Sequence, residues 1–213
     1  MLARVTILYL LISLLGVGIS HAQENKAAPI EKRTEEAIFA MGCFWCGESE
    51  FRDHVTNEPI SGIVSLRVGY AGGKTPDPTY ENHEGYKEAL KISYDPSLIS
   101  YKALLDIFWH NVDLFDDKGQ FCDKGFPYTS VIYYKTPEQK LQAESTKKEV
   151  RKLFKEDVVT EIIPFSTFYD AEEYHQNYRA KNPVAYKFYR WNCGRDKRLK
   201  EIWSKIKPKD LEP

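Results

Sequence analysis

The sequence predicts an α+β fold, a two-layer ferredoxin-like plait with a mixed or antiparallel sheet and a helical C-terminal tail. Segments with strand and helix patterns alternate along the chain, but the second and third strands follow each other with no helix between them, which favours an antiparallel pair. The C-terminal end carries a charged segment with helical periodicity. The chain of 213 residues is long enough to bury a sizeable core in one domain.

Residues 1–22 have the pattern of a signal peptide. Arg4 precedes an almost wholly apolar run, and a small-x-small cleavage site ends at Ala22. We expect cleavage after Ala22, because the apolar run is shorter than the ~20 residues of a membrane-spanning helix; an uncleaved anchor is the alternative. The protein is then exported to the periplasm or secreted, with residues 23–35 as a polar linker and residues 36–213 as a single domain.

Alternating or continuous apolar residues predict five strands. The first is a short buried run, and the second and third show the period of two that is typical of half-buried strands. The predicted strands are 36–41, 64–70, 88–94, 130–134 and 158–165.

Helices are predicted between these strands and after them. Ser100 is a good N-cap for an amphipathic helix, and Thr136 opens a capping box with proline at the first helical position. Loops rich in glycine and proline, at 69–80 and within 112–129, are expected to carry functional residues. The predicted helices are about 44–54, from 101 through 108, 137 to about 155, 171–178 and 196–207.

Composition excludes some classes of partner. Without residues 1–22, which hold one basic and no acidic residue, the net charge changes from −1 to −2. We therefore expect no nucleic-acid partner and no stable membrane association, and we expect a monomer. All four cysteines would lie in an oxidising compartment, so two structural disulfides or a redox centre are the alternatives.

Cys43 and Cys46 form a C-x-x-C pair at the predicted transition from the first strand to the first helix. A helix N-terminus favours an anion and lowers the pKa of a thiol there, so Cys43 is the candidate nucleophile. A zinc site with Cys122 and Cys193 is disfavoured, because zinc sites usually combine two close pairs. His175 offers a cysteine peptidase alternative, but Cys43 lacks the sequence context of that class.

Aromatic residues around this pair leave two interpretations open. Phe44 and Trp45 either pack in the core or form a pocket for a sulfur-bearing substrate, since thioethers contact aromatic faces favourably. Some tyrosines in the glycine- and proline-rich loops could point their hydroxyls into a cleft. Those tyrosines are Tyr70, Tyr80, Tyr86 and Tyr128.

An ordered series of motifs resembles peptide methionine sulfoxide reductase, A type, over roughly residues 38 to 203. The series is Gly42-Cys43-Phe44-Trp45, Gly69-Tyr70-Ala71-Gly72-Gly73, Pro78-Thr79-Tyr80, Gly85-Tyr86-Lys87-Glu88-Ala89, Tyr94-Asp95-Pro96, Phe108-Trp109-His110, Asp123-Lys124-Gly125, Tyr174-His175-Gln176 and Lys181-Asn182-Pro183. The resemblance makes residues 36–213 a catalytic domain. It implies thiol attack on methionine S-sulfoxide, free or in proteins, with a sulfenic acid intermediate and disulfide recycling. It also implies no bound cofactor and an external thioredoxin-like dithiol reductant.

The resemblance also implies a role for each matching residue. The sulfoxide oxygen must accept a proton before the sulfur can be attacked, and a carboxyl in an apolar pocket keeps that proton at neutral pH. The implied roles are nucleophile for Cys43, methyl-binding wall for Phe44 and Trp45, acid for Glu88, hydroxyls that bind the substrate oxygen for Tyr80 and Tyr128, and orienting carboxylate for Asp123.

The resolving thiol stays open at this stage. Many family members carry recycling cysteines in a glycine-rich tail, whereas this chain ends in a charged segment with no cysteine after Cys193. We favour Cys46, which is the nearest, although a disulfide needs its Cβ atoms about 4 Å apart and an intact helix would resist this. Cys193 is the second candidate and Cys122 the third.

Overall fold

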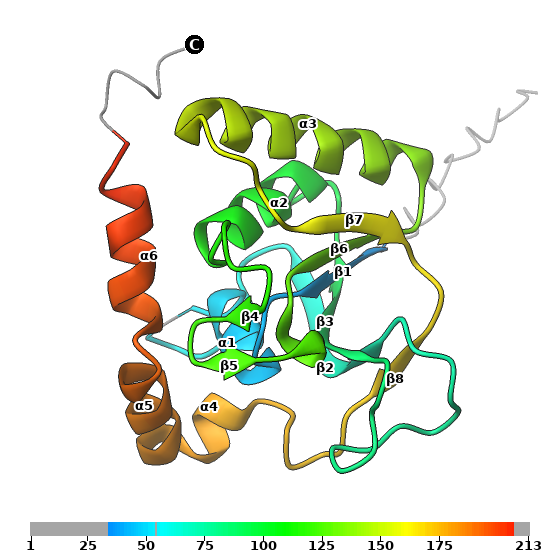
Figure 1. The fold of residues 1–213 in the computed structure, drawn as a ribbon. Coiled ribbons are helices and arrows are strands. Elements are labelled where there is room, and N and C mark those ends of the chain that lie inside the picture. Colours follow the sequence, from blue (N-terminus) through cyan, green and yellow to red (C-terminus); the bar gives the residue numbers. More distant parts are fainter. Residues whose placement is uncertain (1–33, 54, 207–213) are drawn as a thin grey trace, which may run out of the picture. The chain divides into compact units, whose positions relative to one another are not determined.

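The computed structural model describes residues 34–53 and 55–206 of the chain (Figure 1). Contacts divide the chain into two units, Met1–Glu31 and Lys32–Pro213, and every described residue belongs to the second. The predicted signal peptide therefore lies outside the described residues. Within the described part, no helix combines the length and the apolar character that crossing a membrane requires.

Six strands form one mixed sheet in the order β7-β6-β1-β3-β2-β8. The β6–β7 pair is parallel and the other neighbours are antiparallel, including the predicted pairing of the second and third strands. The α+β class with a mixed sheet is therefore confirmed. The strands are β1 (Glu35–Ala40), β2 (Ile63–Ala71), β3 (Lys87–Tyr94), β6 (Val131–Tyr134), β7 (Glu161–Pro164) and β8 (Phe168–Asp170).

Strand β1 shows how the sequence fills both faces of this sheet. Ala37 and Phe39 belong to the larger core, whereas Ile38 and Ala40 point into a smaller cluster on the other face. All four side chains are fully buried, because β1 is an inner strand with β3 and β6 as neighbours. Burial on both faces explains why this strand is continuously apolar instead of alternating.

Four of the six helices in the described residues contribute to the larger core, and the last of them does so through Ile202 (Figure 1). Ser100 and Thr136 cap their helices as predicted, each accepting a hydrogen bond from the backbone N–H three residues later. The helices are α1 (Phe44–Glu50), α2 (Tyr101–His110), α3 (Pro137–Phe154), α4 (Tyr178–Lys181), α5 (Pro183–Asn192) and α6 (Arg195–Trp203).

The C-terminal third corrects the sequence-based assignment. The helix predicted at 171–178 is wrong, because that segment forms turns between β8 and α4. Strand β8 and helix α5 were not predicted. Pro183 is the first residue of α5, a position where its fixed φ and missing N–H cost nothing. The 112–129 loop contains the short strands β4 (Gly119–Gln120) and β5 (Asp123–Lys124) and the 3-10 turn Phe126–Tyr128.

Candidate active site

A tight turn between β1 and α1 presents Cys43. Gly42 adopts a φ of +78°, which favours glycine, and a Cβ there would lie 2.5 Å from the Cβ of Gln120. Gln120 is itself fixed, since its side-chain amide accepts from the N–H of Asp113 at 2.7 Å and donates to that residue's carbonyl at 3.0 Å. The turn therefore requires glycine immediately before the cysteine.

Cys43 and Cys46 are both free thiols and both are buried. Cys43 is the N-cap of α1 with a non-helical ψ of 120°, so the pair spans N-cap and N3, the positions that a capping side chain normally connects. Their side chains are hydrogen-bonded to each other. The Gly47 N–H still closes this turn by donating to the Cys43 carbonyl at 3.1 Å, so what sets the pair apart from two residues inside a helix is the non-helical backbone of Cys43.

The charge on this pair differs from the sequence-based expectation. Burial raises the pKa of Cys43 above its ordinary value, and this outweighs the helix N-terminus that was predicted to lower it. The hydrogen bond from Cys43, together with the nearby guanidinium groups of Arg195 and Arg190, lowers the pKa of Cys46 to about 7. These surroundings therefore favour a thiolate at Cys46 over one at Cys43.

Glu88 points from β3 to the start of α1. Its Oε2 accepts the backbone N–H of Phe44 at 2.9 Å, and its side chain also accepts a hydrogen bond from Tyr128. Only 2% of Glu88 is exposed. Burial raises its pKa to about 8, because removal from water disfavours the carboxylate. At neutral pH this carboxyl is a proton donor.

The predicted site residues meet in one small cavity of about 60 Å³. A water molecule takes up about 30 Å³ of liquid, so this cavity matches the tip of a side chain, such as a methyl group with a neighbouring sulfoxide, and not a whole amino acid. The lining residues are Cys43, Phe44, Trp45, Tyr80, Glu88, Asp123, Tyr128 and Tyr189.

The aromatic wall is held by contacts outside the cavity. The ring of Trp45 stacks on Tyr178 with centroids 3.7 Å apart and planes 6° apart, and its indole N–H donates to Nδ1 of His175 at 3.0 Å. His175 thus positions Trp45 through Nδ1, and the side-chain hydrogen bonds of the Cys43 thiol are with Cys46 and Tyr189 instead of with His175, which argues against the cysteine peptidase alternative. Phe44 is both a core residue and part of the cavity wall, so the two interpretations left open by the sequence, core packing and a substrate pocket, both hold for it.

The loop tyrosines separate into two groups. Tyr80 and Tyr128 line the cavity, and burial raises the pKa of each, so both hydroxyls remain hydrogen-bond donors. Tyr70 donates to Glu172 at 2.9 Å, and the Tyr86 hydroxyl donates to the carbonyl of Thr75. Spacing could not distinguish these groups because it contains no information on side-chain direction.

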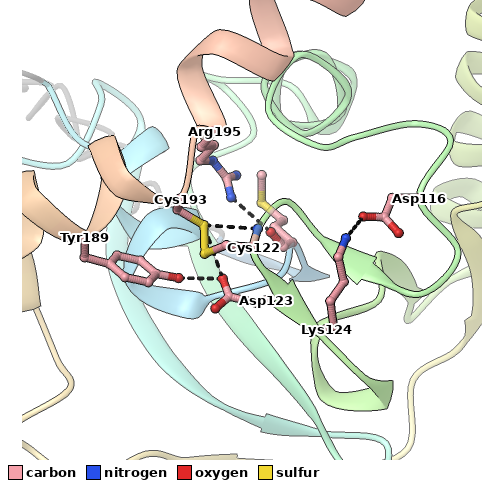
Figure 2. The surroundings of a disulfide bond; sticks show 8 residues. Asp116, Cys122, Asp123, Lys124, Tyr189, Cys193 and Arg195 are labelled. Carbon is pink, nitrogen blue, oxygen red and sulfur yellow. Dashed lines mark hydrogen bonds and ion pairs between the residues drawn. A yellow bond between two sulfur atoms is a disulfide. The ribbon is translucent and has the colours of Figure 1, made fainter.

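Asp123 connects the cavity to a disulfide (Figure 2). Its Oδ2 accepts the Tyr189 hydroxyl at 2.5 Å and lies 3.9 Å from Sγ of Cys193, which is bonded to Cys122. Tyr189 also contacts the Cys43 thiol through its hydroxyl. The alternative of two structural disulfides is wrong for this structure, which has one disulfide, between Cys122 and Cys193, and free thiols at Cys43 and Cys46. That bond withdraws the Cys122 and Cys193 sulfurs as thiolate metal ligands.

Two site residues were missed from the sequence. Tyr189 lies on the unpredicted helix α5, and Arg195 is buried beside Cys46 at the start of α6. Pro183, followed by a breaker-free segment as far as Gly194, would have predicted α5. No local signal places Tyr189 against Cys43, because that contact joins residues far apart in the chain.

Comparisons with known proteins match nearly the whole described chain. The family model described as "Peptide methionine sulfoxide reductase" matches residues 35–207. Peptide methionine sulfoxide reductase MsrA 2 of Caulobacter vibrioides is 41% identical over 182 residues, which cover 83% of this chain and 88% of that protein.

Solved structures match as well. Mxr1 from Saccharomyces cerevisiae in reduced form superimposes with a TM-score of 0.64 at 30% identity, covering 71% of this chain and 87% of the yeast chain. The same yeast protein in complex with Trx2 gives a TM-score of 0.50 at 25% identity, covering 72% of this chain and 91% of that one.

Proposed function

Because the chain belongs to the peptide methionine sulfoxide reductase family, we infer that it reduces methionine S-sulfoxide, free or in proteins, to methionine with a thioredoxin-type dithiol as electron donor. The observation that carries this function is the meeting of Cys43 and the buried Glu88 carboxyl, whose pKa burial raises to about 8, in a cavity sized for a methyl sulfoxide. In this role Phe44 and Trp45 receive the S-methyl group, since aromatic faces contact methyl and sulfur groups favourably.

In the first step Glu88 donates one proton and Cys46 accepts another. Glu88 protonates the sulfoxide oxygen, which makes the substrate sulfur electrophilic. As the Cys43 sulfur attacks, its proton passes along the existing hydrogen bond to the Cys46 thiolate. The bond between Cys43 and the substrate sulfur that this attack forms then breaks, as the hydroxyl moves from the substrate sulfur to the Cys43 sulfur. Methionine is released and Cys43 is oxidised to a sulfenic acid.

Hydroxyl groups hold the substrate oxygen during this step. Tyr80 and Tyr128 donate to it, and Tyr128 does so by turning to the substrate the one hydroxyl proton that it otherwise donates to Glu88. Asp123 acts through Tyr189, because it accepts that hydroxyl and fixes it against the Cys43 sulfur. Asp123 is therefore a positioning residue, while Tyr189 touches the reacting sulfur.

Cys46 is the resolving thiol in this account. Its sulfur attacks the Cys43 sulfenic sulfur and forms the Cys43–Cys46 disulfide, and the hydroxyl leaves as water with the Cys46 proton. The N-cap to N3 placement and the pairing of Cys122 with Cys193 support this choice, because Cys46 is the adjacent free thiol. Cys193, and after it Cys122, is the alternative.

A turnover assay tests the function. With dithiothreitol as reductant, the protein is expected to convert methionine S-sulfoxide to methionine, and Cys43→Ser is expected to abolish this. Insulin disulfide reduction is the control for a general dithiol oxidoreductase. No methionine formation together with insulin reduction would contradict the proposal.

We also propose that the protein is exported, cleaved after Ala22, and acts as a monomer in the periplasm or outside the cell. The charged residue, apolar run and small-x-small site of residues 1–22 support export. N-terminal sequencing of the protein recovered from fractionated cells tests it. A cytoplasmic protein that retains Met1 would contradict the proposal.

A further inference from the structure

Lys87, the residue before Glu88, is a buried lysine. Only 4% of it is exposed, although lysine is almost never fully buried unless it is paired. It is the first residue of β3, and neighbouring side chains of a strand point to opposite faces of the sheet. Glu88 points to the start of α1, so Lys87 points to the other face, which also carries Ala89 and its small apolar cluster. No step of the proposed reaction uses Lys87, so its burial points to a different role.

The ammonium group of Lys87 binds both ends of one surface turn. Its Nζ donates to the Phe126 carbonyl at 2.9 Å and to the Thr129 hydroxyl, and it lies 3.4 Å from the centroid of the Phe126 ring. A carbonyl, a hydroxyl and an aromatic face each attract a cation, which compensates for its removal from water. Lys87 therefore fastens residues 126–129 to the start of β3.

The turn itself contains little that would fix its position on the sheet. Phe126 is 56% exposed, and Pro127 has no backbone N–H to donate. The backbone N–H groups of Tyr128 and Thr129 donate back to carbonyls at the start of the turn, at 3.1 Å and 3.4 Å. These two bonds close the turn but do not connect it to β3, and the contacts of Lys87 supply that connection.

Tyr128 is the member of this turn that reaches the active site. Its side chain lines the cavity and its hydroxyl donates to Glu88. The two groups that Lys87 binds belong to Phe126 and Thr129, which flank Tyr128 in the chain. Lys87 thus holds the turn from one face of β3, while Tyr128 meets Glu88 on the other.

We propose that Lys87 is a positioning residue for sulfoxide reduction, because it fixes the turn that aims the Tyr128 hydroxyl at Glu88 and at the substrate oxygen. The inference rests on the proposed function, in which Tyr128 donates to that oxygen. Lys87 does not line the cavity, so it acts through Tyr128 and not on the substrate. Displacing a catalytic group by about 1 Å can cost about 100-fold in rate, so loss of this anchor is measurable in turnover.

Substitution of Lys87 by methionine tests this role. Methionine keeps much of the side-chain length but has no ammonium group, so both turn contacts are lost. With methionine S-sulfoxide and dithiothreitol, kcat/KM is expected to fall about tenfold. Lys91→Met is the matched control, because Lys91 lies on the same face of β3 and its Nζ also lies over an aromatic ring, that of Phe168, at 4.7 Å. The control is expected to change kcat/KM by less than about twofold.

The pH dependence distinguishes this role from a general loosening of the fold. The hydrogen bond from Tyr128 lowers the pKa of Glu88, so a displaced Tyr128 moves the fall of kcat/KM near pH 8 to higher pH. The charges of Asp123 and Cys46 also act on Glu88, and the substitution leaves both residues in place. In a Tyr128→Phe background, Lys87→Met is expected to change neither kcat/KM nor the pH of this fall, whereas a direct effect of the lost charge would persist there.

Three outcomes overturn the inference. They are a folded Lys87→Met protein with kcat/KM within about twofold of the natural protein, an equal loss in the Tyr128→Phe background, and an equal loss in Lys91→Met. If urea unfolding shows that Lys87→Met is not folded, Thr129→Val replaces it, since valine keeps the shape but removes one acceptor of Lys87.

Thr129→Val is expected to lower kcat/KM about threefold, and only while the Tyr128 hydroxyl is present. No loss, or the same loss with Tyr128→Phe, would again overturn the inference. Failure of the proposed function would be seen separately, as absence of dithiothreitol-driven turnover in the unmodified protein.

Discussion

Replacement of Glu88 by glutamine tests the assignment of the acid. The amide keeps an oxygen that can accept the Phe44 N–H, which Glu88 accepts at 2.9 Å, but it has no proton to give to the sulfoxide. With a pKa of about 8, roughly 90% of Glu88 is protonated at pH 7. Loss of a general acid lowers rates about 10²–10⁴-fold, so kcat for Glu88→Gln is expected to fall by that factor.

The same substitution has a predicted effect on stability. Glu88 binds its proton more tightly in the folded than in the unfolded chain, since burial raises its pKa from the ordinary 4.5 to about 8. The stability that this contributes is fully present below pH 4.5 and is lost as the pH rises through 8. This pKa difference corresponds to at most about 5 kcal/mol in the free energy of unfolding. Glu88→Gln is therefore expected to be more stable than the natural protein at pH 9, and equally stable near pH 4.

Two assays measure these effects. Dithiothreitol-driven formation of methionine gives kcat, and urea unfolding at pH 4 and pH 9 gives the free energy of unfolding. Glu88→Asp is the control, because it retains an acid but sets it back by one methylene from the Phe44 N–H, and it is expected to lose less activity. A Glu88→Gln protein that keeps more than a tenth of kcat, or that is no more stable at pH 9, would refute the reasoning.

The value of kcat/KM is expected to rise with pH near pH 7, as Cys46 loses its proton, and to fall near pH 8, as Glu88 ionises. Cys46→Ser is expected to remove the rise near pH 7. Tyr189→Phe removes a hydroxyl that contacts the nucleophile and is expected to lower kcat/KM about tenfold, and a change below twofold would contradict its role. Gly42→Ala is expected to lower the free energy of unfolding in urea by about 2–4 kcal/mol, because of the positive φ and the contact with Gln120. Gly85→Ala, where φ is similar but no atom is near, is expected to lower it by about 1 kcal/mol.

Local patterns predicted most of the fold because local physics determines it. The caps Ser100 and Thr136 act within three residues, and the alternation along β2 reflects one face of one strand. The meeting of Cys43 with Glu88 came from family resemblance, since their contact joins β1, α1 and β3 and no single segment encodes it.

Other features depend on long-range packing and were not predictable in this way. The Cys122–Cys193 bond joins residues 71 apart, and spacing does not decide which cysteines meet. The pKa of Cys43 was predicted from its place at a helix start, but burial reverses the direction, and burial depends on the whole fold. Proline occurs both just after one helix and at the start of the next, so neither α5 nor the placement of Tyr189 on it was predicted.

The central claim is that Cys43 reduces the sulfoxide and Cys46 resolves it. The most direct measurement is a single turnover: the fully reduced protein is mixed with excess methionine S-sulfoxide in the absence of reductant, and methionine and disulfides are mapped by mass spectrometry at the earliest times. The account predicts that the first equivalent of methionine per protein appears together with a Cys43–Cys46 disulfide, and that Cys43→Ser yields none. Methionine formation by Cys43→Ser, or a first disulfide between Cys43 and Cys193, would contradict it.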